Sequence, residues 1–225
     1  MNHLYSWCIL ILLVASGCDS TNDKKDNSVN TNASKEEVAK PFDFRKVNWE
    51  MSKKEVEEIE GITFSKSPNI LKYSLPNVAG QRTDLYYYFH LNKLIRAVYV
   101  FGKDNSYKYQ FYNDFDTIGN ILISKYGAPT QYKEDWVSEE KKKEYEKRGA
   151  LYFGNAVATE NLTRFRIWNK GRTIISEYCL GEEKDVGIEF VRPKSSVYHI
   201  VEYKFSELDR VKKETSAAET YSDDL

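Results

Sequence analysis

The sequence has few of the residues from which most catalytic and metal sites are built. It contains three cysteines and three histidines, and it has no G-x-S-x-G, H-E-x-x-H or C-x-x-C motif and no P-loop. In common enzyme folds these patterns hold nucleophiles, metal ions and phosphates. We therefore expect a protein that is not an enzyme and that uses neither a cofactor nor a metal.

An excess of charge of one sign is also missing. The chain has 33 Lys and Arg residues against 34 Asp and Glu residues, which gives a formal net charge of −1. Nucleic-acid-binding domains usually carry a basic patch, because contacts with phosphates supply much of their affinity. We therefore expect no nucleic-acid partner.

The first 17 residues contain no Asp, Glu, Lys or Arg. Their apolar stretch, Trp7 to Ala15, has the length of a signal-peptide core and is too short to span a bilayer. Small residues at 15–17 precede Cys18, and the chain turns polar directly afterwards. The segment from Val14 to Cys18 resembles the lipobox of bacterial lipoproteins.

This resemblance implies cleavage before Cys18, a diacylglycerol thioether on its sulfur and acylation of the new amino terminus, for example by palmitate.

Three acyl chains make a permanent anchor, whereas a single chain binds a membrane only marginally. Asp19 resembles the residue that retains lipoproteins in the inner membrane, in those envelopes that sort by the position after the cysteine. We therefore expect a lipid-anchored protein of the bacterial cell envelope. If the envelope is Gram-negative, the periplasmic face of the inner membrane is favoured.

Two other segments contain too little apolar surface to fold. Residues 18–40 are rich in Ser, Thr, Asn, Asp and Lys, and the tail at 213–225 is similar. Such segments cannot offset the entropy that ordering them would cost. We expect a lipidated flexible tether at 18–40 and a disordered tail.

Between these segments, helical and strand patterns alternate. Ser52 and Glu55 form a capping box at the start of an apolar stripe that ends at Gly61. Runs of β-branched and aromatic residues indicate strands. We expect helices at 52–60, 109–126 and 138–149, hairpins that turn at 92–93 and 169–171, and further strands at 186–191 and 197–205.

This order predicts an α+β fold, in which two units, each a helix followed by antiparallel strands, form one compact domain. The signal peptide at 1–17 and the tether precede the domain. We place the first helix-plus-sheet unit at 41–128 and the second unit, mostly antiparallel sheet, at 129–212.

The run Tyr86-Tyr87-Tyr88 is the candidate binding surface. In a strand, Tyr87 faces the side opposite to Tyr86 and Tyr88, so tyrosines occupy both faces of the sheet. This pattern leaves two interpretations open, a sheet covered on both sides or an aromatic surface that binds a partner.

The remaining chemistry-bearing residues favour structural roles. His90 and His199 fall inside predicted strands, where we expect satisfied, half-buried side chains rather than metal ligands. Cys179 is expected to be a buried free thiol, because no disulfide framework can be read from so few cysteines. A thiolate pair of Cys179 and His199 is the less favoured alternative.

The stretch FRKVNWEMSKKEVEEIEG at 44–61 and the later KYGAPT resemble an uncharacterised bacterial lipoprotein family. Its members carry F-R-x-x-x-W-G-M-S-x-x-E-V and K-Y-G-x-P. Glu50 stands where the family has Gly, a departure that bears on the turn before the helix. The likeness spans Phe42 to Phe205. At the level of fold, the chain is similar to small outer-membrane assembly lipoproteins of the SmpA/OmlA type and to β-lactamase-inhibitor proteins, which implies protein binding.

Two hypotheses about function follow. The first is a membrane-anchored, non-enzymatic lipoprotein that binds an envelope or secreted protein, in assembly, inhibition or immunity. The second is an enzyme or small-ligand binder with an unrecognised site of Tyr, Arg and acidic residues. A pocket where Arg82, Arg96 or Arg164 converges with tyrosines would favour the second. The oligomeric state stays open.

Lipidation gives the first prediction. Mass spectrometry of the mature amino terminus is expected to show Cys18 as the first residue, carrying acyl chains. Cys18→Ala should abolish the modification, because the thioether needs the sulfur. An unmodified terminus upstream of Cys18 in the wild-type chain would contradict this expectation.

Overall fold

The structure is a computed structural model, and it describes residues 42–61, 65–102, 106–181 and 197–211. All of them belong to the compact unit that begins at Lys40. The signal peptide, the tether, the tail and the strand predicted at 186–191 lie outside the described residues.

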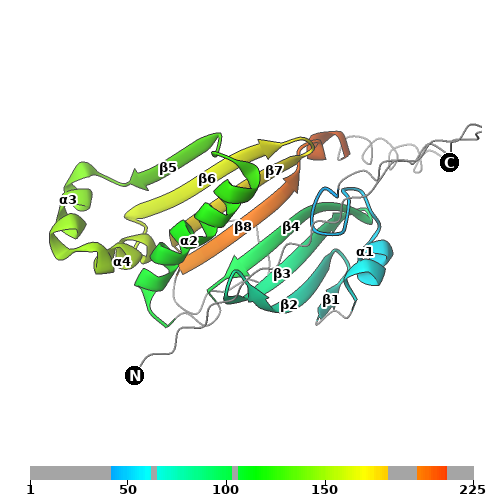
Figure 1. Cartoon of the computed structure of the whole chain (residues 1–225), viewed down its shortest axis with the longest axis horizontal. Coiled ribbons are helices and arrows are strands. Elements are labelled where there is room, and N and C mark those ends of the chain that lie inside the picture. The colour runs from blue at the N-terminus through cyan, green and yellow to red at the C-terminus, as the bar shows by residue number, and fades with distance from the viewer. Residues whose placement is uncertain (1–41, 62–64, 103–105, 182–196, 212–225) are drawn as a thin grey trace, which may run out of the picture. The chain divides into compact units, whose positions relative to one another are not determined.

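Within the described residues, eight antiparallel strands form one sheet, in the order β1-β2-β3-β4-β8-β7-β6-β5 (Figure 1). The antiparallel α+β architecture predicted from the sequence is therefore confirmed. The strands are β1 (Ser65–Ser67), β2 (Ile70–Val78), β3 (Gln81–His90), β4 (Lys93–Phe101), β5 (Gln131–Trp136), β6 (Leu162–Lys170), β7 (Thr173–Gly181) and β8 (Val197–Phe205).

The sheet consists of two four-stranded meanders that meet in the middle. Helix α1 (Lys53–Glu60) precedes strands β1–β4, and helix α2 (Lys108–Tyr126) precedes strands β5–β8. The last strand of each meander pairs with the other, so that β4 lies antiparallel to β8. This pairing makes one sheet out of two halves of the chain that follow each other in sequence.

The boundary predicted at residue 128 is wrong in one respect. Helix α2, which we assigned to the first unit, packs on β6, β7 and β8 of the second meander. Its apolar side chains meet strands that come after it in the chain. The division between the two units therefore falls before α2.

Helix α1 begins and ends where the local sequence signals predict. Ser52 caps α1, its side chain accepting from the Glu55 backbone N–H, and the full capping box is present. Gly61 ends this helix with φ 87°. The turn between β3 and β4 is Leu91-Asn92, one residue before the predicted 92–93, and both residues have the positive φ that a tight hairpin turn requires.

Glu50 keeps the turn before α1, although it replaces the glycine of the resembling family. Its φ is 70°, in the left-handed region that glycine adopts without strain. Arg172 Nη2 donates to its carboxylate at 3.0 Å, and Arg210 and Lys93 pair with the same group at 3.4 and 3.7 Å. These contacts stabilise a conformation that is unfavourable for a residue with a side chain.

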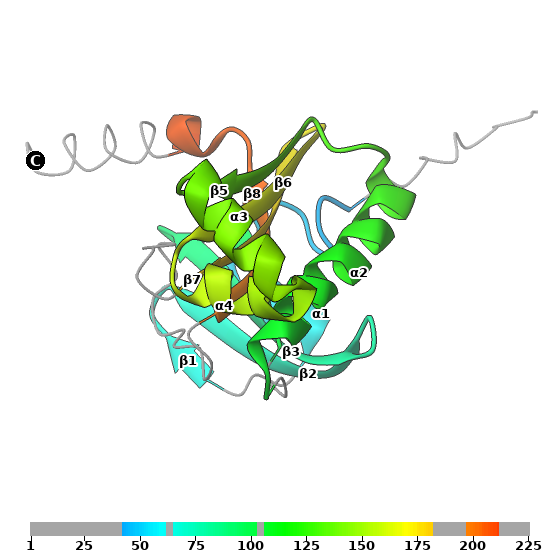
Figure 2. The ribbon, with the colours of Figure 1, turned by 90° about the vertical axis from the view of Figure 1, so that its left-hand side faces the viewer.

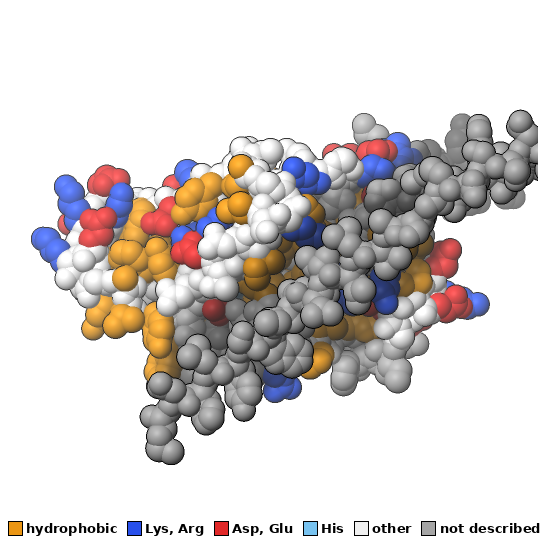
Figure 3. Space-filling model, viewed as in Figure 1, with side chains coloured by type: hydrophobic (Ala, Val, Ile, Leu, Met, Phe, Trp, Pro, Cys, Tyr) orange, Lys and Arg blue, Asp and Glu red, His pale blue; other side chains and the backbone are white. Residues whose placement is uncertain are grey.

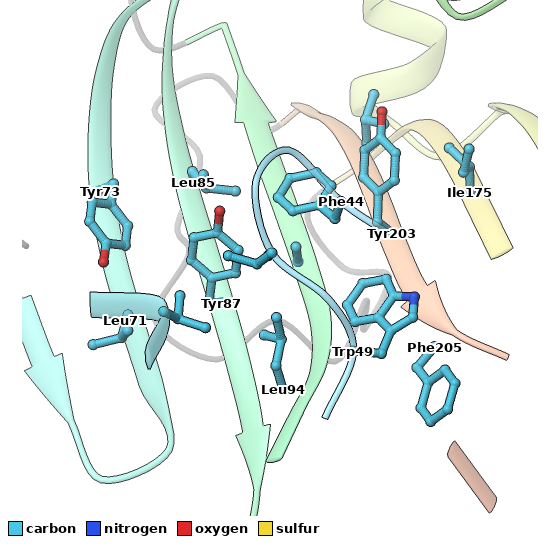
Figure 4. Close-up of a cluster of buried hydrophobic side chains, with 14 of the residues drawn as sticks. Phe44, Trp49, Leu71, Tyr73, Leu85, Tyr87, Leu94, Ile175, Tyr203 and Phe205 are labelled. Atoms are coloured by element: carbon cyan, nitrogen blue, oxygen red, sulfur yellow. The ribbon is translucent and has the colours of Figure 1, made fainter. Parts of the chain in front are cut away.

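The main core lies between the sheet and the segments that cover one of its faces, here called the helix face. In Figure 4, Phe44 lies against Tyr203, and Trp49 lies beside Phe205. The Trp49 indole N–H donates to Thr173 Oγ1 at 2.9 Å, a buried bond between residues 124 positions apart. The segment before α1 therefore fastens the first half of the chain to β7.

A second core lies where the helices α3 (Glu139–Arg148) and α4 (Phe153–Ala158) meet α2, at the end of the molecule that Figure 2 views directly. A Cβ atom at Gly154 would come within 2.2 Å of the Lys108 carbonyl carbon. Only glycine therefore lets α4 approach the first turn of α2 so closely. No sequence pattern predicted α4, strands β1, β2 and β5, or the 3-10 turn η1 (Ala150–Tyr152).

Candidate functional site

The residues predicted to fix the protein's location, Cys18 and Asp19, lie outside the described residues. None of the helices in the described part of the chain is long and apolar enough to span a membrane. The membrane anchor therefore remains a prediction from the sequence alone.

The three consecutive tyrosines do not form one surface. Tyr87 is fully buried on the helix face, where its hydroxyl hydrogen-bonds with Glu60 of α1. The prediction of a binding surface is thus wrong for Tyr87, because strand alternation turns this side chain into the core. Tyr86 and Tyr88 stack on the second face of the sheet, with ring centroids 6.4 Å apart.

On that second face, the tyrosines already have charged neighbours. Lys72 Nζ lies 5.1 Å from the Tyr86 ring centroid, and the Arg96 guanidinium lies 5.0 Å from that of Tyr88. Lys72 also pairs with Asp84 at 2.9 Å. Tyr86 is only 5% exposed and Tyr88 is half-buried, so this face offers a partner little aromatic surface.

The main feature that the sequence did not predict is a network of charges around two buried arginines. Arg164 and Arg166, on the helix face of β6, both donate to Asp116 Oδ1 at 2.8 Å. Arg166 also donates to Glu177 Oε2 on β7 at 2.8 Å. Arg164 pairs further with Glu134 on β5 at 3.1 Å.

Aromatic rings and backbone carbonyls complete the surroundings of the two guanidinium groups. The ring of Phe115 lies 4.4 Å from the Arg164 guanidinium and 4.1 Å from that of Arg166. The carbonyls of Tyr112 and Phe115 accept from Arg164 and Arg166. Burial by itself lowers the pKa of Arg164, because it disfavours the charged form. The hydrogen bonds with Asp116 and Tyr132 have the larger combined effect, so the pKa is raised.

Gly119 of α2 makes room for this network. A Cβ atom there would come within 1.7 Å of Arg166 Nη1 and 3.0 Å of Glu177 Oε2. The helix backbone therefore lies directly over the ion pair and closes it from solvent. The sequence does carry a signal for the network, because Arg164 and Arg166 occupy two of the alternate positions of β6 whose other members, Leu162 and Trp168, are apolar and buried.

His199 joins the inner end of this network, and Cys179 lies beside it in the sheet. They are cross-strand partners on β8 and β7, as a thiolate pair would require. However, His199 Nε2 lies 3.1 Å from Glu177 Oε1, and because a carboxylate oxygen only accepts, the imidazole N–H donates a hydrogen bond to Glu177. The Cys179 thiol points elsewhere and donates weakly to the Phe111 carbonyl.

The Cys179 thiol is also chemically unreactive in this environment. Its side chain is fully buried, and this burial raises the pKa of the thiol to about 12. The thiolate, which is the nucleophilic form, is therefore scarce near neutral pH. The expectation of a buried free thiol is confirmed for Cys179.

The histidines and arginines do not form an open site in the described part of the chain. His199 is completely buried, whereas His90 is the last residue of β3 and half-buried. Arg96 lies on the second face and Arg164 on the helix face, so they do not converge. Within the described ranges, no three His, Cys, Asp or Glu side chains are grouped to hold a metal ion.

Large apolar side chains are exposed at one corner, which we call the apolar corner and define as Tyr107, Leu151 and Tyr152. Their exposed fractions are 63%, 70% and 44%. Leu151 and Tyr152 belong to η1, which lies against α2, and Tyr107 is the residue before α2. Figure 3 shows apolar side chains gathered over this end of the molecule, beside the basic and acidic groups of α3.

The comparisons with known proteins give no class for this fold and this site. No family model matches the chain, and neither a similar curated protein nor a similar solved structure was found. The likeness to a lipoprotein family therefore stays a prediction from the quoted motifs.

Removing the charge of Glu177 should strongly destabilise the fold. Glu177→Gln leaves Arg166 and His199 as buried donors that face an amide, and we expect the free energy of unfolding to fall by about 3 kcal/mol. Chemical denaturation measures this change. Glu144→Gln is the matched control, because Glu144 also pairs with two basic side chains, but on the exposed surface of α3. An equal loss of unfolding free energy in both variants would contradict the expectation that the buried ion pair matters more than the exposed one.

The Cys179 thiol should resist alkylation in the folded protein. At pH 8, iodoacetamide is expected to modify it only after denaturation, as peptide mass spectrometry would show, whereas Ser206→Cys supplies an exposed control thiol. The folded state holds the thiol proton more tightly than the unfolded state. Its contribution to stability is therefore complete below about pH 8.5 and is lost as the pH rises towards 12. Rapid labelling of Cys179 in the folded protein would contradict this prediction and favour the thiolate pair of Cys179 and His199.

Proposed function

We propose that this protein is a lipid-anchored component of the bacterial cell envelope that binds another protein and catalyses no reaction. Anchoring rests on the segment from Val14 to Cys18, where small residues precede the cysteine at the end of an apolar run. A role in assembly, inhibition or immunity fits this proposal.

The apolar corner is the observation that supports protein binding. Leu151, Tyr152 and Tyr107 are all exposed where η1 lies against α2, and aromatic residues are enriched among the side chains that dominate binding energy. Soluble proteins rarely leave such side chains clustered in water without a use for them. We therefore place the contact at this corner rather than at Tyr86 and Tyr88.

The charged side chains support the same proposal. Arg164, Arg166 and Glu177 are paired with one another or with Asp116 and closed beneath α2. A substrate or small ligand that needed these charges would have to break existing pairs. The network is therefore better suited to stabilising the fold than to catalysis, and the enzyme hypothesis gains no support from it.

A crosslinking pulldown from intact envelopes tests this proposal. The test variant replaces Tyr107, Leu151 and Tyr152 with Ser, which is a favoured helix N-cap residue at position 107. We expect this variant to enrich the partner protein at least about tenfold less than the wild type does. Large side chains that dominate an interface typically contribute about 1 kcal/mol or more each.

Two comparisons make the pulldown specific. A control variant replaces Ile121 and Ile123, which are exposed on α2 away from η1, with Ser, and it should retain the partner. Cys18→Ala should lose both membrane association and enrichment. The proposal fails if the corner variant enriches the same proteins as the wild type, or if the wild type enriches none above an unrelated lipoprotein.

A further inference from the structure

Strand β5 ends the sheet and has no strand on its outer side among the described residues. It is six residues long, QYKEDW, and pairs only with β6. Gln131, Tyr132, Lys133 and Asp135 are all exposed. Its outer row of backbone N–H and C=O groups is therefore a template for another strand.

The side chains of β5 divide cleanly between the two faces. Tyr132 and Glu134 lie opposite Arg166 and Arg164 of β6, so they point to the helix face. Lys133 and Asp135 lie opposite Phe165 and Thr163, and they point to the second face. Each face thus carries its own set of contacts at this edge.

This arrangement is complementary to itself. If two copies of β5 pair antiparallel about a two-fold axis at Glu134, Lys133 of each copy lies opposite Asp135 of the other. In the same register, Tyr132 of each copy lies opposite Trp136 of the other on the helix face. A two-fold interface requires this kind of match, in which one patch fits a second copy of itself. Opposite charges and aromatic pairs directly across strands are both stabilising.

We propose that β5 is a homodimerisation edge, through which two copies of this chain join their sheets in that register. Charges on an edge strand normally prevent pairing with strands at random. Here the same charges admit a strand that carries the complementary pattern and repel one that does not. Lys133 Nζ already lies 2.9 Å from Asp135 Oδ2 of its own chain, and in the dimer the four charges of the two copies alternate in sign around the contact.

The central contact of this register brings two Glu134 carboxylates to the same point. Each is already paired with Arg164 of its own chain, at 3.1 Å between Nε and Oε2. This neighbouring positive charge offsets the repulsion between the two carboxylates. Arg164 of the charge network therefore also favours pairing of β5 with a second copy of itself.

The interface is small, so the dimer should be weak. Two paired six-residue strands bury less than the roughly 1,200 Å² of a standard stable interface. We expect a dissociation constant in the micromolar range or above. The inference is independent of the proposed protein partner, whose contact lies at the apolar corner.

Cysteine crosslinking of the full chain in its native membranes tests the register. Glu134→Cys should give a disulfide-linked dimer on mild oxidation with copper phenanthroline, because residue 134 faces its own copy. Tyr132→Cys should not, because the two copies of residue 132 are offset by about 13 Å along the strands. The wild-type chain shows whether the native cysteines link by themselves.

Charge reversal tests the complementarity. In analytical ultracentrifugation of the full chain in a non-ionic detergent, Lys133→Glu should raise the dimer dissociation constant at least about tenfold, because two attractive pairs become repulsive. Adding Asp135→Lys to the same chain should restore it to within about twofold of wild type. Lys170→Glu, an equal change of net charge on an exposed residue beyond the part of β6 that pairs with β5, should leave the dissociation constant unchanged.

Several results would overturn the proposal. One is equal crosslinking at positions 132 and 134, or none at either position. Another is a Glu134→Cys adduct with a different protein. A third is a double variant that dimerises no better than Lys133→Glu.

Discussion

The pairing of β4 with β8 is the contact on which the rest of the structure depends. It joins Arg96 through Phe101 to residues about a hundred positions later in the chain, and it makes one sheet from two meanders. With this pairing in place, Phe44 and Tyr203 meet in one core, although they come from opposite halves of the domain. Such distant contacts carry a high cost in chain entropy, which the buried aromatic surface must offset.

The same sheet determines where charge can be buried. Arg164 and Arg166 sit on β6 beneath α2, and carboxylates from α2, β5 and β7 surround them. A buried ion pair is seldom the most stabilising choice, because desolvation of both ions offsets much of their attraction. Its geometry nevertheless fixes how α2 seats on the sheet, since Gly119 must lie directly over the Arg166 side chain. The network thus constrains how α2 packs on the sheet as much as it stabilises the fold.

The two surfaces that carry our proposals differ in kind. The apolar corner presents exposed apolar and aromatic side chains, whereas β5 presents an open strand edge with alternating charges. A partner at the corner would gain mainly from burial of apolar surface, and a second copy at β5 mainly from backbone hydrogen bonds and matched charges. Because α3 and α4 separate β5 from β6 in the chain, one insertion shapes both surfaces.

The sequence by itself determined the elements whose signals are local. The capping box at Ser52, the glycine stop at Gly61, helix α2 and the central hairpins were predicted because each depends on neighbouring residues. Strand β5 was missed because its polar run QYKEDW becomes a strand only beside β6, and α4 because its close approach to α2 needs Gly154. Only the tertiary structure decided that Tyr87 is core, that α2 belongs to the second meander, and that Arg166, Glu177 and His199 meet. Those outcomes depend on which strands pair, and strand pairing is set by contacts between residues far apart in the chain.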